Sequence, residues 1–423
     1  MDKILQIFRI PDLRKKILIV LFWLLVFRLF AAIPIPGIDV LKLQQFFSSN
    51  QLFGFLNIFS GGGLSNLSVM MLGVGPYITA TIIMQLLTII FPNLKKIYYE
   101  EGPEGRAKFN RISRYLTVPL ATIQAYGFLN LLLSQKILTN LSSLALISNV
   151  IVITAGSVFL MWIGELITEY KIGNGISLII FAGIVSGLPQ TISSSFINYT
   201  AAVLPTYFAF AVLSIIVIAG VVFITEGERK IPVSYAKQVR GTKLYGGVST
   251  YLPLKVNQAG VIPIIFAISL LLFPQFLAQA VSIVSPDLSL RLNEIVSKFF
   301  NNMILYSILY FILVALFTYF YTAITFNPEE IAKNLQKSGG FVPGIRPGKA
   351  TAEIIAKVVN RTTFFGALFL GTVAVLPNIT QIFTNIKALT IGGTALLIVV
   401  SVGLEVMKQI ESQLTVREYE GIL

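Results

Sequence analysis

The segment of this sequence closest to a reactive motif is GGFVPGIRPGKAT, in which Gly348 and Lys349 stand as in a phosphate-binding loop. A P-loop needs a Gly five residues before this Gly-Lys pair and a Ser or Thr directly after it, because backbone amides, the ammonium and the hydroxyl together hold phosphate and Mg²⁺. Pro343 and Ala350 occupy those two places. The sequence therefore predicts no nucleotide hydrolysis by the chain itself.

Other reactive side chains are scarce. The chain has no His and no Cys, which excludes imidazole bases, thiolate nucleophiles, disulfides and the usual zinc or haem ligands. Charged residues within apolar stretches are limited to Arg28, Glu165 and Glu405, and the two carboxylates stand near expected helix ends where they can snorkel. A structural role, paired or hydrated, is favoured for Arg28. We expect no enzyme, no catalytic residue, no metal and no cofactor.

Ten apolar stretches make up this chain, and they must position any functional residues. The mean hydropathy is +0.81, and 55% of the residues are hydrophobic while only 12% are charged. A helix that crosses a membrane needs about 20 apolar residues, so we predict an all-α polytopic membrane protein. The expected spans are residues 17–35, 69–91, 115–134, 147–168, 176–195, 207–225, 259–283, 302–325, 362–384 and 390–408.

The basic residues orient these spans. Of the 32 Lys and Arg residues, 26 fall in segments on one side, which the positive-inside rule places in the cytosol together with both termini. The basic start followed by an apolar run from Ile17 is interpreted as a retained first helix rather than a cleaved signal. Topology explains the net charge of +13 better than nucleic-acid binding, although a basic cytosolic surface could meet ribosomal RNA.

Two cytosolic loops are too long to be simple connections. Residues 226–256 have the pattern of two short strands around a turn, with basic residues interleaved with Tyr. Residues 327–361 begin as a polar helix and continue with Gly and Pro residues that favour a projecting tip. Anchoring to anionic lipid is one interpretation of these loops. Docking of a cytosolic partner accounts better for their length.

The segment between the first two spans, LFGFLNIFSGGGLSNLSVMMLG, is apolar but interrupted by three successive glycines. Such a backbone has to be buried in protein or line a wet cavity, and it is a candidate for a short movable element.

Similar strings also recur five spans apart, GVGPYI from Gly73 with GVIPII from Gly260, and GNGISLII from Gly173 with GGTALLIV from Gly392. This recurrence favours a five-plus-five inverted repeat with a pathway between the halves.

The sequence resembles the SecY/Sec61-alpha family, the channel subunits of the Sec protein translocase, in its bacterial or plastid type. The resemblance runs nearly end to end through RLFAAIPIPGID, NIFSGGGLS, LGVGPYITATIIMQLL, MWIGELITEYKIGNGISLIIFAGIVSGLP, YLPLKVNQAGVIPIIFA, FNPEEIAKNLQKSGGFVPGIRPG and GGTALLIVV. The departures are a short C-terminal tail ending at Leu423 and a short, weakly charged outer loop near residues 280–300.

The resemblance implies two halves, residues 1–200 and 201–423, that close like a clamshell around a pore. Its waist would be a ring of apolar side chains, which block ions by dewetting while yielding around a moving chain. For any one of these residues alone, ordinary packing is the simpler interpretation. The ring would comprise Val74, Ile78, Ile176, Ile180, Ile265 and Ile398.

The resemblance also implies a plug, at about residues 52–65, and a lateral gate formed by the second, third, seventh and eighth spans. Plug residues would include Phe55, Leu56, Ile58, Phe59, Gly61, Gly62 and Gly63. Gate contacts would include Thr79, Thr81, Gln85, Gln124, Asn257 and Gln258, for which ordinary interhelical hydrogen bonding is the alternative. Docking of the SecA motor or the ribosome would use Arg229, Lys230, Lys237, Arg240, Lys243 and Arg346.

The implied function is a passive channel that moves unfolded preproteins across the membrane and releases transmembrane segments into lipid. Implied partners are the SecE and SecG subunits, SecA, the ribosome, signal-bearing preproteins and anionic lipids. The location would be the inner (plasma) membrane, or the thylakoid if the gene is plastid-encoded. The alternative is an inverted-repeat secondary transporter of a small solute, which predicts a polar or charged site at the midplane, where the matched residues here are Ile and Val.

Overall fold

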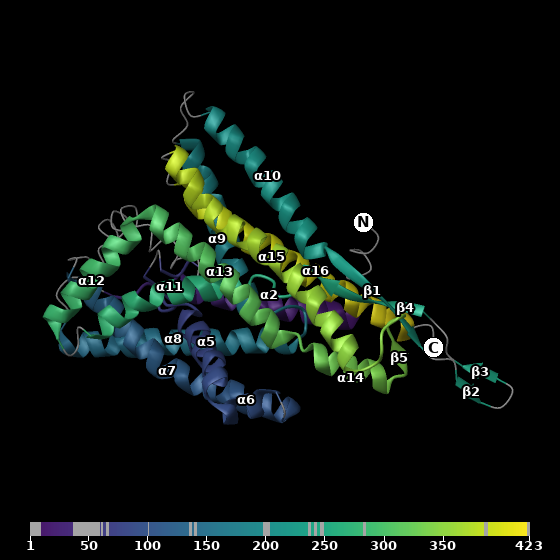
Figure 1. Ribbon diagram of the computed structural model, residues 1–423. Helices are drawn as coiled ribbons and strands as arrows, with labels where there is room; N and C mark the ends of the chain where they lie inside the picture. Colours follow the sequence, from purple (N-terminus) through teal and green to yellow (C-terminus); the bar gives the residue numbers. More distant parts are fainter. Residues whose placement is uncertain are drawn as a thin grey trace.

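The computed structural model describes residues 10–36, 60, 62–64, 67–99, 101–134, 138, 142–197, 204–235, 238–240, 243–245, 249–281, 285–384 and 388–420. This part of the chain is mostly helical, with long helices packed side by side and small strands at one end (Figure 1). The helices are α2 (Pro11–Ala31), α5 (Gly75–Ile90), α6 (Pro92–Tyr99), α7 (Gly102–Ser134), α8 (Ser143–Glu169), α9 (Gly175–Ile197), α10 (Leu204–Glu226), α11 (Ile262–Val281), α12 (Pro286–Asn301), α13 (Met303–Thr325), α14 (Pro328–Lys337), α15 (Lys349–Thr384) and α16 (Ala388–Glu420).

Each of the ten predicted spans overlaps one of these helices, but fewer of them meet a strict criterion for crossing a membrane. Three stretches in the described part of the chain are long and apolar enough, namely Ser143–Glu169, Met303–Lys337 and Lys349–Ile382. A fourth is possible if α5 and α6, which meet at a bend of 116°, count together as one span. Several apolar helices are therefore present, and ten crossings stay a prediction.

The start of α5 differs from the expected span. Residues 69–74 form turns, and the helix begins only at Gly75 with a proline in its first turn, where a missing N–H costs nothing. Gly73 just before it has φ 58°, a left-handed conformation that favours glycine. Gly260, in the matching string before α11, has φ 61°. The repeated string thus has the same backbone conformation at both places.

The second pair of repeated strings is used in two ways. GNGISLII begins α9, whereas GGTALLIV lies inside α16, which begins at Ala388. The expected outer loop near residues 280–300 also differs, since residues 286–301 form α12. Phe299 and Phe300 at the end of this helix are partly buried against the core.

The two long loops form one unit, which qualifies the all-α prediction. Strands β1 (Glu228–Tyr235) and β4 (Ser249–Lys255) pair antiparallel, and β2 (Gln238–Arg240) pairs with β3 (Lys243–Tyr245) in a hairpin. Strand β5 (Gly340–Phe341), from the second loop, adds to the free edge of β1, giving the order β4-β1-β5. The sequence pattern predicted strands in the first loop but not β5 in the second.

A small apolar core explains why α15 begins earlier than the predicted span. Ile231 and Leu254 of the sheet pack with Val342, Ile355 and Val359. The helical residues 349–361, which precede the predicted span, bring Ile355 and Val359 to this sheet. This contact buries both side chains and joins the loops to the helix bundle.

Candidate functional site

The six predicted ring residues all belong to the main apolar core of the described part of the chain, while their arrangement as a ring stays a prediction. They lie in one apolar cluster, reached from the start of α5 by Val74 and Ile78, and from α9, α11 and α16 by the other four. Five are buried, with exposed fractions from 0% to 5%, while Ile176 is half-buried against the cluster. Helices from both predicted halves thus supply branched aliphatic side chains to the same apolar core.

Local hydrogen bonds position the two ring residues of α9. The Asn174 side chain accepts from the backbone N–H groups of Ile176 (3.1 Å) and Ser177 (3.2 Å), which caps the helix. The Gly175 N–H donates to the Thr168 hydroxyl of α8 (2.9 Å). A Cβ at Gly175 would collide with the backbone of α8, so only glycine permits this approach of the two helices.

The helices of the predicted gate pack on one another. Helix α11 contacts α5, α7 and α13, which correspond to the predicted second, third and eighth spans. We call the contact of α11 and its preceding turn with α5 and α7 the gate seam. Predicted gate residues of this region are buried or half-buried: Thr79, Thr81, Gln85, Gln124, Asn257 and Gln258.

Hydrogen bonding in the gate seam is incomplete. Thr79 and Thr81 donate to carbonyls of their own helix, those of Gly75 (3.0 Å) and Tyr77 (2.9 Å). The Asn257 amide donates to the Gly260 carbonyl (3.2 Å), but its Oδ1 and the Oε1 of Gln85 are buried and accept no hydrogen bond from the described residues. The expected bonds between gate helices are thus not formed by these two oxygens.

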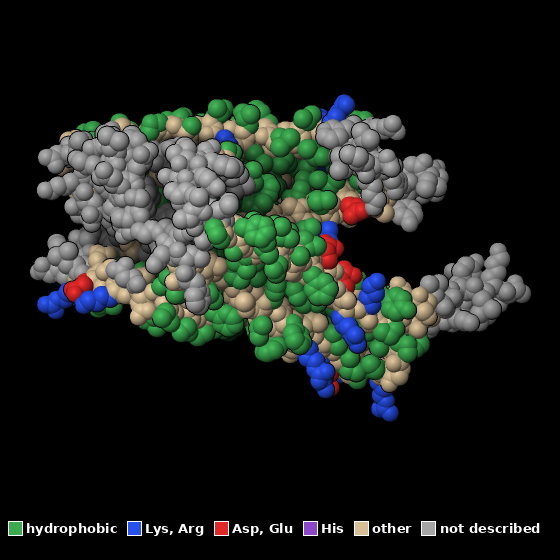
Figure 2. Space-filling model, turned by 90° about the horizontal axis from the view of Figure 1, so that it is seen from above, with side chains coloured by type: hydrophobic (Ala, Val, Ile, Leu, Met, Phe, Trp, Pro, Cys, Tyr) green, Lys and Arg blue, Asp and Glu red, His purple; other side chains and the backbone are tan. Residues whose placement is uncertain are grey.

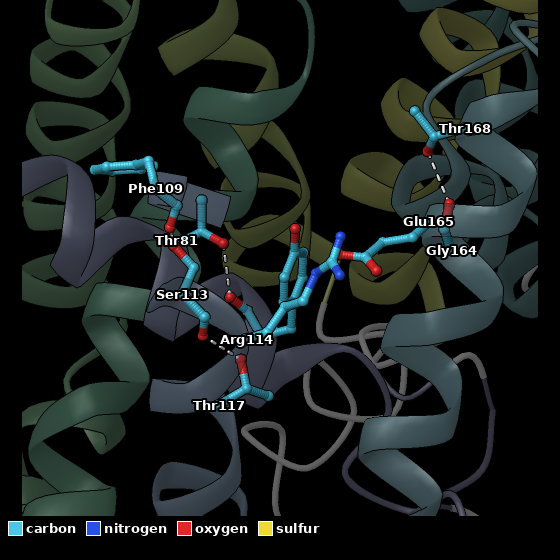
Figure 3. A network of polar contacts seen from close by, with 9 residues as sticks. Thr81, Phe109, Ser113, Arg114, Thr117, Gly164, Glu165 and Thr168 are labelled. Atoms are coloured by element: carbon cyan, nitrogen blue, oxygen red, sulfur yellow. Dashed lines mark hydrogen bonds and ion pairs between the residues drawn. The ribbon is translucent and has the colours of Figure 1, made fainter. Parts of the chain in front are cut away.

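One ion pair lies between α7 and α8. Arg114 Nε donates to Glu165 Oε1 at 2.6 Å, and Figure 3 shows the guanidinium pointing from α7 toward the carboxylate. Glu165 is therefore paired rather than simply snorkelling. Sequence reasoning missed Arg114, since 51 residues separate the partners and nothing in the local pattern connects them.

A second set of polar contacts, also missed, joins the two predicted halves. The side chain of Gln413 in α16 accepts from Lys16 Nζ of α2 (3.3 Å) and donates to the backbone carbonyl of Lys171 (2.6 Å). Within the second half, Lys408 and Glu226 form an ion pair of 2.9 Å between α16 and α10. These contacts hold the predicted cytosolic ends of helices together.

The predicted docking residues gather around the strands. Arg229 and Lys230 are exposed on β1, and Arg346 is exposed in the turn between β5 and α15. The Thr351 hydroxyl donates to the Arg346 carbonyl (3.0 Å), which braces that turn. Residue 237 lies outside the described residues, and Arg240 faces Lys243 in the register of β2 and β3.

The surface agrees with this distribution of charge. On the face seen in Figure 2 the centre is apolar, while Lys and Arg side chains gather mainly toward the end where α14 and the strands lie.

Of the predicted plug, Phe55, Leu56, Ile58, Phe59 and Gly61 lie outside the described residues. Gly62 and Gly63 belong to turn structure, in which Gly63 is buried. No group of three acidic residues that could hold a metal occurs in the described part of the chain.

Comparisons with known proteins decide the family. The SecY family model matches residues 68–407. This chain belongs to the SecY family. It is 44% identical to the protein translocase subunit SecY of Streptomyces galbus, over 98% of both chains.

Two solved structures share the fold of this SecY-family chain. One is described as the structure of a protein conducting channel, with 21% identity, a TM-score of 0.65 and coverage of 93% of this chain and 90% of that one. The other is Sec61 in the canine ribosome-channel complex from the endoplasmic reticulum, with 20% identity, a TM-score of 0.62 and the same coverage. The predicted family resemblance is confirmed.

Proposed function

We propose that this chain is the pore-forming subunit of a protein translocase, a passive channel that moves unfolded preproteins across a membrane. The observation that carries the proposal is that a chain of the SecY family places six matched aliphatic residues, from four helices, in its main apolar core. A narrow apolar constriction excludes hydrated ions yet forms no specific bonds with a passing chain. Such a site fits a channel rather than an enzyme.

The proposed architecture is ten crossings in two halves, residues 1–200 and 201–423, around this ring. Helices at all ten predicted positions and the matching backbone conformation at Gly73 and Gly260 support it. In this arrangement both termini and the basic sheet face the cytosol of a plasma membrane, or the stroma if the chain is plastid-encoded.

We assign residues 52–65 as the plug and the gate seam as the lateral exit to lipid. Buried amide oxygens without partners support the gate, because they lower the cost of separating the helices. The basic surface around β1 and Arg346 would dock SecA or the ribosome, with SecE and SecG as further subunits and anionic lipid around the chain. The family relationship and the exposed cations support these partners.

A secondary transporter is not favoured. That function calls for polar or charged groups that bind a solute at the midplane of broken helices. The helices that meet at the centre of this chain present Val and Ile there.

The function is tested by cross-linking a stalled preprotein. A photoreactive residue at Ile78 or Ile398 of the chain, reconstituted with its partner subunits and motor, should cross-link to a translocating chain. The matched control is the same photoreactive residue at Leu305, an exposed apolar position of α13. Equal labelling at the ring and at Leu305, or none at the ring during active transport, would contradict the channel.

The docking surface is tested by Arg346→Glu. Reversing this exposed charge should impair motor-driven export while leaving folding and membrane insertion intact, since the side chain contributes to no described core. Export of a preprotein into vesicles measures the effect. Normal export at limiting motor concentration would exclude a docking role for Arg346.

A further inference from the structure

Arg28 of α2 lies beside the Gly-rich turn that precedes α5. A Cβ built on Gly62 would be 3.4 Å from Arg28 Nη1 and 4.0 Å from the carbonyl oxygen of Gly183 in α9. Gly62 therefore lies close to both the Arg28 guanidinium of the first predicted span and the α9 backbone of the fifth. Arg28 also lies over the ring of Phe27, with its Cζ 5.9 Å from the ring centroid.

The turn has a firm base. The Gly63 carbonyl accepts from both the backbone N–H (2.9 Å) and the hydroxyl (3.0 Å) of Ser68, and the Leu64 N–H donates to the Ser60 hydroxyl (2.9 Å). Ser60, Leu64 and Ser68 are buried. Gly62 has φ 82°. The turn is thus attached to the chain leading to α5 at Ser68, while Gly62 is next to the guanidinium.

A charged residue in an apolar helix is costly unless polar groups surround its charged end. The guanidinium carries five N–H donors in a planar fork and no acceptor, so backbone carbonyls of a glycine-rich turn are well suited to it. Glycine suits residue 62 because its φ of 82° is a left-handed conformation, whereas a Cβ there would only reach ordinary contact distance from the guanidinium. The turn thus has backbone, and no side chain, at the residue next to the guanidinium.

We propose that Arg28 is a positioning residue that holds the Gly-rich turn against α2 and α9 in the resting channel. Displacement of the turn then requires the guanidinium to give up its contact. Arg28 thereby sets how readily the pore opens. The same contact also offsets the cost of placing the Arg28 charge in an apolar helix. This inference rests on the proposed channel function, because in such a channel the segment before α5 moves when the pore opens.

The experiment uses the absence of cysteine from the chain. Ser60→Cys introduces a thiol of nearly the same size at a position that is 1% exposed. In vesicles containing the chain with its partner subunits, a membrane-impermeant maleimide should label this thiol slowly. Adding Arg28→Gln should raise the labelling rate roughly tenfold, because loss of one charge-assisted contact shifts an opening equilibrium by about that order.

Two further variants make the result specific. Arg28→Lys keeps the charge but lacks the planar fork, so its labelling rate should be intermediate. Arg14→Gln removes an exposed arginine from the first turn of the same helix and should leave the rate unchanged. A parental labelling rate in Arg28→Gln would overturn the proposal. If that variant does not assemble, a parental rate in Arg28→Lys would overturn it.

The outcome is separable from that of the channel proposal. If Arg28 does not hold the turn, labelling is unaffected while preprotein still cross-links to Ile78. If the chain is not a channel, the cross-link fails while Arg28→Gln still exposes the thiol.

Discussion

The apolar ring and the gate seam are both buried and both involve α5 and α11, but they differ in how their side chains are satisfied. The ring is made of Val and Ile side chains that require no hydrogen bond. The gate seam buries the amides of Gln85 and Asn257, each with an oxygen that accepts no bond from the described residues. The two regions are therefore buried to a similar extent, but one is apolar and the other contains polar groups without partners among the described residues.

This contrast assigns different tasks to the two regions. Aliphatic side chains exclude ions whether or not a neighbour shifts slightly, because dewetting depends on width and polarity rather than on specific partners. A buried oxygen without a partner raises the energy of the packed state, typically by about 1–3 kcal/mol. The ring is thus suited to sealing, and the gate seam is poised to separate.

The largest effect is expected where polarity enters the ring. Ile78→Asn or Ile398→Asn should wet the constriction and raise ion leak through the resting channel. A decrease of about 1.4 kcal/mol in the barrier to ion passage corresponds to a tenfold increase in the leak. Conductance of vesicles that contain the chain and its partner subunits measures the leak.

The matched controls separate polarity at the ring from disturbance of the core. Ile78→Val keeps the position apolar and should leave the leak low. Leu370→Asn places the same amide elsewhere in the cluster, at a residue that is 1% exposed. A leak from Leu370→Asn as large as that from Ile78→Asn would remove the distinction between the ring and its surroundings.

A smaller and opposite effect is expected in the gate seam. Gln85→Leu removes an unsatisfied oxygen and should stabilise the closed state by about 1–3 kcal/mol. Asn257→Leu removes such an oxygen too, but it also loses the bond to the Gly260 carbonyl, so its stabilisation should be smaller. The channel should then reject preproteins whose signal sequences have been weakened, while strong signals still pass. Gln124→Leu tests the α7 side of the gate seam, where the amide is also buried.

Asn149→Leu is the control for the gate seam. Asn149 in α8 is also buried and its Nδ2 has no partner among the described residues, but α8 is not a gate helix. This variant should stabilise the chain without altering signal stringency, as measured by export of preproteins with graded signals. Equal stringency changes in Asn149→Leu and Asn257→Leu would show that general stability, not the gate, is being measured.

Several elements could be predicted because their causes are local. The Gly-Val-x-Pro strings predicted related helix starts, and Gly73 and Gly260 share a left-handed conformation. The alternating pattern near residue 230 predicted strands, and the polar helix from Pro328 was also found. Helix α12 was missed because its low hydrophobicity resembles a loop when only spans are sought.

Contacts between distant residues could not be predicted in this way. Arg114 pairs with Glu165, and Gln413 bonds to α2 and to Lys171, but none of these partners is within one helical turn of the other. The pairing of β5 with β1 likewise needs two separate loops to meet.

The sequence by itself determined that this chain is a helical membrane protein of the SecY family, because hydropathy, charge distribution and ordered motifs are properties of the linear chain. Only the tertiary structure decided which side chains share a site. It placed the predicted ring residues of four helices in one apolar core, left buried oxygens in the gate seam and placed Arg28 beside Gly62. The physical reason is that packing satisfies or fails to satisfy each buried group through neighbours that lie far apart in sequence.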